Sequence, residues 1–164
     1  MPPDQPPREI ERKFLVVGDG WRDTASEAKR VRQAYLALTD RAQVRVRIVA
    51  GGKEAKLTIK SAGAEEDRAE FEYGVPVDEA EAMLALAATR VLAKTRHLVP
   101  AANGREWEID VFEGALEGLV LAEIELGENG EDIVPPDWCG TEVTGDDRYY
   151  NAALAEAGEM PTSD

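Results

Sequence analysis

The stretch Arg8-Glu9-Ile10-Glu11-Arg12-Lys13-Phe14-Leu15-Val16 decides how the rest of the chain is interpreted. Glu9, Glu11 and Lys13 share one parity, whereas the other parity is mostly apolar. Successive side chains of a β-strand point to opposite faces, so a strand here would line one face with two carboxylates and an ammonium. A divalent cation, which binds carboxylate oxygens, would offset the repulsion between the two acids. A solvated edge strand whose charges face water is the alternative that this stretch alone leaves open.

Length and composition bound the class of protein. The 164 residues are enough for one domain with its own core, and 43% hydrophobic with 32% charged residues is typical of a soluble globular chain. The net charge of −14 argues against general nucleic-acid binding, which needs a basic face. Cys139 is the single cysteine, which excludes an internal disulfide and a cysteine zinc site. Because no segment approaches the roughly 20 apolar residues of a membrane span and no signal peptide is evident, we expect a cytoplasmic monomer or homodimer.

Alternating residues predict eight strands, and two segments with helical periodicity predict helices. The strands cover about residues 8–17, 33–38, 44–48, 55–60, 70–73, 91–99, 105–112 and 119–126. The helices cover about 78–88 and 147–157, with one further helical turn at 25–30. The proline-rich residues 1–7 are expected to form a loose arm, 8–158 a single domain and 159–164 a polar tail.

The charged faces of these strands are segregated by sign. The strands at 44–48, 55–60 and 91–99 are basic, those at 70–73, 105–112 and 119–126 are acidic, and the first carries both signs. The charges either face solvent on an open sheet or line a wet barrel whose apolar faces lie outside. Surface strands usually mix signs, which weakens the open-sheet interpretation. A cavity with an acidic and a basic wall suits a metal–polyphosphate complex, since carboxylates hold the cation while guanidinium and ammonium groups hold phosphate oxygens.

In its pattern of charged strands the chain resembles the CYTH superfamily, the triphosphate tunnel metalloenzymes. Glu9-Ile10-Glu11-Arg12-Lys13 is similar to the family's Glu-x-Glu-x-Lys motif, and paired-charge strands follow in the family's order. These are Val44-Arg45-Val46-Arg47, Leu57-Thr58-Ile59-Lys60, Glu70-Phe71-Glu72, Lys94-Thr95-Arg96, Trp107-Glu108-Ile109-Asp110 and Glu123-Ile124-Glu125-Leu126, continuing to Tyr149 and Asn151. The resemblance implies an α+β fold, a closed eight-stranded antiparallel β-barrel with a few flanking helices, which binds triphosphate and a divalent metal, Mg²⁺ or Mn²⁺.

The resemblance also implies a role for each paired charge. The implied metal ligands are Glu9, Glu11, Glu123 and Glu125, with Glu70, Glu72 and Asp110 in or near the metal shell. The implied phosphate ligands are Lys13, Arg45, Arg47, Lys60, Lys94 and Arg96. Lys56 shares the charged face of its strand, and its place near the strand start predicts a position at the tunnel rim.

The resulting functional hypothesis is a metal-dependent hydrolase that converts inorganic triphosphate to diphosphate and phosphate. Tyr35 is the one aromatic residue in the inward pattern, which favours a compact substrate over thiamine triphosphate or ATP. A class IV adenylyl cyclase and a polyphosphate-binding sensor without turnover are the alternatives. Lys13 and Tyr35 are the candidate catalytic pair: if Tyr35 points inward and hydrogen-bonds Lys13, the lysine could act as a base, and otherwise it is a phosphate ligand.

Overall fold

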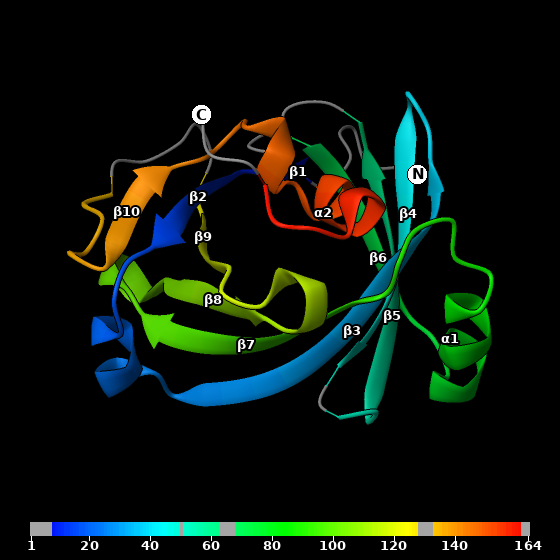
Figure 1. Ribbon diagram of the computed structural model, residues 1–164, viewed down its shortest axis with the longest axis horizontal. Coiled ribbons are helices and arrows are strands. Elements are labelled where there is room, and N and C mark those ends of the chain that lie inside the picture. Colours follow the sequence, from blue (N-terminus) through cyan, green and yellow to red (C-terminus); the bar gives the residue numbers. More distant parts are fainter. Residues whose placement is uncertain (1–7, 50, 63–67, 128–132, 162–164) are drawn as a thin grey trace, which may run out of the picture.

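The computed structural model describes residues 8–49, 51–62, 68–127 and 133–161, so the predicted arm at 1–7 lies outside the described part. Within these residues one antiparallel sheet dominates, accompanied by a few short helices, as predicted (Figure 1). The strands are β1 (Arg8–Glu9), β2 (Glu11–Val16), β3 (Glu27–Leu38), β4 (Ala42–Val49), β5 (Glu54–Ser61), β6 (Arg68–Gly74), β7 (Leu92–Pro100), β8 (Glu106–Phe112), β9 (Val120–Glu125) and β10 (Cys139–Glu142). Their order across the sheet is β1-β6-β5-β4-β3-β7-β8-β9-β2-β10.

The predicted closed barrel of eight strands is wrong, because the described sheet has ten strands and its edges are β1 and β10. The strand expected over residues 8–17 breaks at Ile10, so that β1 pairs with β6 while β2 pairs with β9 and β10. The two ends of the strand order are therefore connected by the covalent chain at Ile10, between β1 and β2, and not by a ladder of hydrogen bonds between strands. The right-handed twist of strands makes a sheet of this width curl, and the curl encloses an interior without a closed ladder.

Two local features give the sheet its shape. The long strand β3 shifts register between Tyr35 and Ala37, and such a bulge bends a strand, as the curved path of β3 in Figure 1 shows. The strand β10, for which no strand was predicted, lies against β2, and Gly140 allows this close approach because it has no side chain. A Cβ there would stand 2.9 Å from Val17 Cγ1 and 3.1 Å from the Leu15 carbonyl oxygen.

The helical segments are shorter than predicted. They are η1 (Gly20–Thr24), α1 (Val77–Leu84), η2 (Ala102–Gly104), η3 (Gly114–Leu116), η4 (Asp147–Tyr149) and α2 (Asn151–Ala157). The helix expected over 147–157 is split, because Tyr150 is extended with φ −68° and ψ 138°. The helical turn expected at 25–30 is wrong. Ala25 is extended, with φ −66° and ψ 130°, and from Glu27 onward the residues pair with β7, so sheet pairing overrides local preference.

The apolar faces of the strands are covered on the outside of the sheet. On one side α1 packs on β3, β4 and β5, as Figure 1 shows, and Ala80 and Leu84 join Val46 and Ile48 in a buried cluster. On the other side η1 and the segment before β10 contribute Trp21 and Trp138 to a second cluster. The members of the second cluster from β2, β8 and β9 are Phe14, Trp107, Ile109, Ala122 and Ile124. With both apolar faces outside, the charged faces are left to the interior.

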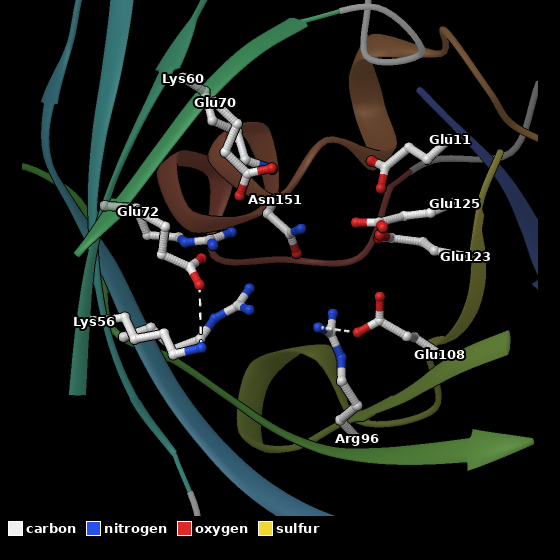
Figure 2. Close-up of a pocket in the computed structure, with 12 residues that line it drawn as sticks. Glu11, Lys56, Lys60, Glu70, Glu72, Arg96, Glu108, Glu123, Glu125 and Asn151 are labelled. Atoms are coloured by element: carbon white, nitrogen blue, oxygen red, sulfur yellow. Dashed lines mark ion pairs between the residues drawn. The ribbon is translucent and has the colours of Figure 1, made fainter. Parts of the chain in front are cut away.

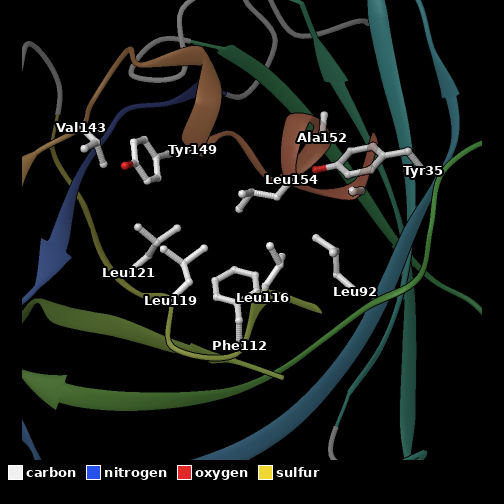
Figure 3. Close-up of a cluster of buried hydrophobic side chains, with 11 residues drawn as sticks. Tyr35, Leu92, Phe112, Leu116, Leu119, Leu121, Val143, Tyr149, Ala152 and Leu154 are labelled. Carbon is white, nitrogen blue, oxygen red and sulfur yellow. The ribbon is translucent and has the colours of Figure 1, made fainter. Parts of the chain in front are cut away.

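A third apolar cluster, which we call the floor cluster, lies inside the curve of the sheet (Figure 3). Three of its members come from strands β7, β8 and β9: Leu92, Phe112 and Leu121. Each is two residues from a charged residue that shares its face, namely Lys94, Asp110 and Glu123 respectively. The remaining members come from β3 and from the segments around η3, η4 and α2: Tyr35, Leu116, Leu119, Val143, Tyr149, Ala152, Leu154 and Ala155. The inward faces thus change from charged to apolar along the strands, and α2 packs on the apolar part.

Candidate active site

A cavity of about 550 Å³ lies above the floor cluster and is lined almost entirely by charged side chains (Figure 2). The lining residues are Glu11, Arg45, Arg47, Lys56, Lys60, Glu70, Glu72, Arg96, Glu108, Glu123, Glu125 and Asn151. We call Glu11, Glu108, Glu123 and Glu125 from β2, β8 and β9 the acidic wall, and Arg45, Arg47, Lys56 and Lys60 from β4 and β5 the basic wall. The register explains the grouping, since residues directly opposite in neighbouring strands share a face.

The acidic wall is built from cross-strand pairs. Glu11 lies opposite Glu125, and Glu123 lies between Lys13 and Glu108 on the neighbouring strands. The side chains of Glu11, Glu123 and Glu125 project from one side into the cavity in Figure 2. Glu123 Oε1 is buried without a hydrogen-bond partner among the described residues, although Lys13 Nζ stands 3.5 Å away. Burial alone would raise the pKa of Glu123, but Lys13, with further help from Arg96 and Lys94, lowers it to about 2, so the group is a carboxylate.

The basic wall contains a matching unsatisfied donor. Arg45 Nη2 donates to Thr58 Oγ1 at 3.3 Å, and Arg47 Nε donates to Gln33 Oε1 at 2.8 Å. Arg45 Nε is buried and has no partner within the described part of the chain. Burial and the nearby charges of Arg45 and Arg96 lower the pKa of Arg47 to about 9, which leaves it a cation near neutral pH. Crowded guanidinium groups with an open donor are suited to an anion with several oxygens.

Glu70 and Glu72 do not lie with the other acids. They come from β6, beside the basic wall and across the cavity from Glu11, Glu123 and Glu125 (Figure 2). Glu72 Oε1 is 3.1 Å from Lys56 Nζ, and Lys60 is opposite Glu70 in the ladder. The structure therefore separates the predicted metal ligands into two groups, and these two acids balance the lysines of β5.

A buried ion cluster supports Arg96 from beneath. Lys94 Nζ is 2.6 Å from Asp110 Oδ2, and Arg96 binds the same carboxylate with two N–H groups, at 2.8 and 2.9 Å. Arg96 also forms an ion pair with Glu108 of the acidic wall. Burial would raise the pKa of Asp110, but Arg96 and Lys94 hold it well below its usual range. Burial lowers the pKa of Lys94 to about 7, against the opposing effect of Asp110.

This arrangement gives two predicted site residues a different place. Lys94 and Asp110 are buried below the cavity and do not line it, and both Asp110 oxygens are already engaged by cations. A metal role for Asp110 is therefore not supported by its contacts. The side chain of Glu9 lies outside the described part of the structure, so its predicted metal role stays a prediction.

The predicted pair of Lys13 and Tyr35 is not formed. Lys13 is fully buried, and its Nζ donates to the Tyr149 carbonyl oxygen at 3.0 Å and faces Glu123. Tyr35 lies in the floor cluster near Leu154 (Figure 3), and within the described residues its hydroxyl makes no hydrogen bond to Lys13. A carbonyl and a carboxylate are partners that favour an ammonium, so the contacts of Lys13 fit a structural cation better than a base.

Three cavity residues had no assigned role in the sequence. Lys56 and Glu108 belong to the inward rows of β5 and β8, and alternation placed both on charged faces without assigning either a ligand role. Lys56 faces the cavity in an ion pair with Glu72. Asn151 could not be found by alternation, because it enters the cavity from the first residue of α2 and not from a strand.

The acidic wall fits a hard divalent cation. Its donors are all carboxylate oxygens, and one of them, Glu123 Oε1, is buried without a hydrogen-bond partner among the described residues. Among the described residues, no three acidic, histidine or cysteine side chains lie close enough together to hold a metal ion by themselves. Mg²⁺ usually binds through one or two carboxylates together with waters and substrate phosphates, so such a cage is not required.

The fold and the cavity place the chain in the class of antiparallel β proteins whose curved sheet encloses a cavity lined by charged side chains. Within this class the chain belongs to the CYTH domain family, whose model matches residues 7–150. It is 40% identical over 150 residues to an inorganic triphosphatase of Acetivibrio thermocellus, covering 91% of this chain and 94% of the relative. An inorganic triphosphatase of Nitrosomonas europaea is also 40% identical over 150 residues, with 90% and 96% covered.

A solved structure agrees with the sequence comparison. The crystal structure of an inorganic triphosphatase matches with a TM-score of 0.63 and 39% identity, over 90% of this chain and 93% of that chain. In the described residues no helix is long and apolar enough to cross a membrane.

Proposed function

We propose that the protein is a divalent-metal-dependent hydrolase that converts inorganic triphosphate to diphosphate and phosphate. The observation that carries the proposal is the pair of opposed walls, each with a buried unsatisfied atom that its ligand would satisfy: Arg45 Nε and Glu123 Oε1. Among the described residues, an anion that met only the basic wall would leave Glu123 Oε1 unsatisfied, and a cation alone would leave Arg45 Nε unsatisfied. A triphosphate with its metal satisfies both. The 40% identical relatives named inorganic triphosphatases support this substrate.

Each wall has a separate task in this proposal. Arg45, Arg47 and Lys60 hold phosphate oxygens, and Arg96 adds a guanidinium that Asp110 and Glu108 hold in place. These cations stabilise the charge that develops on the leaving diphosphate. We propose Glu11, Glu123 and Glu125 as ligands of Mg²⁺ or Mn²⁺, with Glu9 as a further candidate. The bound metal would neutralise phosphate charge and lower the pKa of the attacking water.

Lys13 acts in this scheme by position. Its ammonium is fixed between the Tyr149 carbonyl and Glu123, and it keeps the Glu123 carboxylate ionised beside the other acids. A bound metal would supply the activation of water, so this scheme requires no lysine base.

The direct test is incubation with tripolyphosphate, ATP and thiamine triphosphate, each with and without Mg²⁺ or Mn²⁺. We expect metal-dependent release of phosphate, fastest with tripolyphosphate. Cyclic AMP from ATP would instead identify a cyclase, and binding of tripolyphosphate without any product would identify a sensor.

A further inference from the structure

One cavity residue differs in chemistry from all the others. Of the twelve lining residues in the described part of the chain, eleven are charged, and Asn151 is the exception. It lies between Glu11, Glu123 and Glu125 on one side and Lys60, Glu70 and Glu72 on the other (Figure 2). A neutral amide at the meeting point of two charged walls avoids repelling either an anion or a cation held there.

Its neighbour determines which way the amide points. Lys94 Nζ, which is fully buried, donates to Asn151 Oδ1 at 3.4 Å. An ammonium has donors only, so it can bind the amide oxygen and not the amide nitrogen. The Nδ2 group, with two N–H donors, is thereby turned away from Lys94, and Asn151 is one of the residues that line the cavity.

The segment that carries Asn151 is firmly placed. The next residues of α2, Ala152, Leu154 and Ala155, are buried in the floor cluster. Two residues before Asn151, the Tyr149 carbonyl oxygen accepts the hydrogen bond of Lys13. The segment 149–151 therefore contacts both buried lysines of the site, Lys13 through the Tyr149 carbonyl oxygen and Lys94 through the Asn151 side chain.

We propose that Asn151 is a substrate-contact residue whose Nδ2 donates a hydrogen bond to a phosphate oxygen of the bound triphosphate while Oδ1 keeps Lys94 in place. This inference rests on the proposed function and adds a contact from the C-terminal segment to the two walls of strands. A donor is required at this position, since an acceptor or an anion would face the phosphate oxygens directly.

Two substitutions separate the contact with substrate from the support of Lys94. Asn151→Ala removes both, whereas Asn151→Asp keeps an acceptor for Lys94 and replaces the donor by an anion. Glu156→Ala, on the exposed side of the same helix, is the matched control. For each protein we would measure kcat and KM for tripolyphosphate with Mg²⁺, calorimetric binding of tripolyphosphate in EDTA, and thermal melting.

We expect Asn151→Ala to raise KM and weaken binding about tenfold, because a hydrogen bond to a charged oxygen is lost. Asn151→Asp should bind about a hundredfold more weakly than wild type, since donor loss and repulsion add, with a melting temperature equal to or above that of wild type. The Glu156→Ala control should behave as wild type.

Other outcomes overturn the inference in distinguishable ways. If Asn151→Asp keeps the melting temperature of wild type and binds and turns over tripolyphosphate like wild type, the residue supports Lys94 and does not contact substrate. A wild-type protein that binds tripolyphosphate but releases no phosphate overturns the proposed function and leaves the contact to be judged by binding, whereas one that does not bind tripolyphosphate overturns both.

Discussion

Arg96 and Asp110 face each other across β7 and β8 and are joined by two N–H contacts, Nε to Oδ1 at 2.8 Å and Nη2 to Oδ2 at 2.9 Å. The aspartate is almost fully buried, while the guanidinium continues into the cavity. Such a two-point contact restricts the plane of the guanidinium. The position of one phosphate-binding group is thus set by a carboxylate that the cavity does not expose.

Replacing Asp110 should change how stability depends on pH. Burial opposes ionisation, but Arg96 and Lys94 hold the pKa of folded Asp110 well below the ordinary 3.8. A depressed folded pKa contributes stability above the unfolded value, and this contribution is lost as pH falls below about 4. We expect Asp110→Asn to be about 3–5 kcal/mol less stable at pH 7, because two buried cations lose their partner, and to lose less stability on acidification.

Urea unfolding of wild type and Asp110→Asn between pH 7 and the acid limit of folding measures this difference. Two stability curves that stay parallel throughout would show that Asp110 contributes nothing to acid sensitivity. Asp40→Asn, at an exposed turn, is a suitable control and should follow wild type.

The acidic wall should control turnover without controlling the fold. Metal-dependent turnover should fall by about a hundredfold or more in each of Glu11→Gln, Glu123→Gln and Glu125→Gln. The same loss is expected for Glu9→Gln, the further candidate ligand. Steady-state phosphate release at several metal concentrations is the measurement, with exposed Glu117→Gln as the control. Near-normal turnover in all four variants would remove the metal assignment.

The basic wall should recognise the length of the anion. Arg45→Ala, Arg47→Ala and Arg96→Ala should weaken binding of triphosphate more than that of diphosphate, because a longer anion contacts more cations. Arg45→Lys should not restore full affinity, since an ammonium cannot replace a planar two-point donor. Calorimetric titration tests this, with exposed Arg41→Ala as the control. Equal losses for triphosphate and for a monophosphate would indicate general electrostatics.

Tyr35→Phe should retain activity. The tyrosine is buried in the floor cluster, and in the described part of the chain its hydroxyl does not contact Lys13. Removing one hydroxyl there should change turnover by less than about threefold, and the pH profile of turnover should keep its shape, because no proton is relayed through this side chain. Loss of the alkaline limb in Tyr35→Phe would restore the lysine–tyrosine pair as the catalytic base.

Alternation in the sequence was enough to identify which side chains face the interior. Arg45 and Arg47, or Glu123 and Glu125, are two residues apart, and a strand places such residues on one face whatever the rest of the fold does. Segregation of sign between strands then indicated opposed walls, which the cavity contains. The same period left open whether Tyr35 points inward, and it gave no information on its surroundings, which are the floor cluster.

Only the tertiary structure decided how deep each residue lies and what it meets. Parity assigns a face, whereas register and curvature set the position along and around the interior. Lys94 therefore shares a face with Arg96 and yet lies beneath the cavity, where it binds Asp110. Glu70 and Glu11 are both inward acids, but β6 and β2 place them on opposite sides. Asn151 comes to the cavity because α2 packs on the floor cluster, a contact between distant segments that no local period encodes.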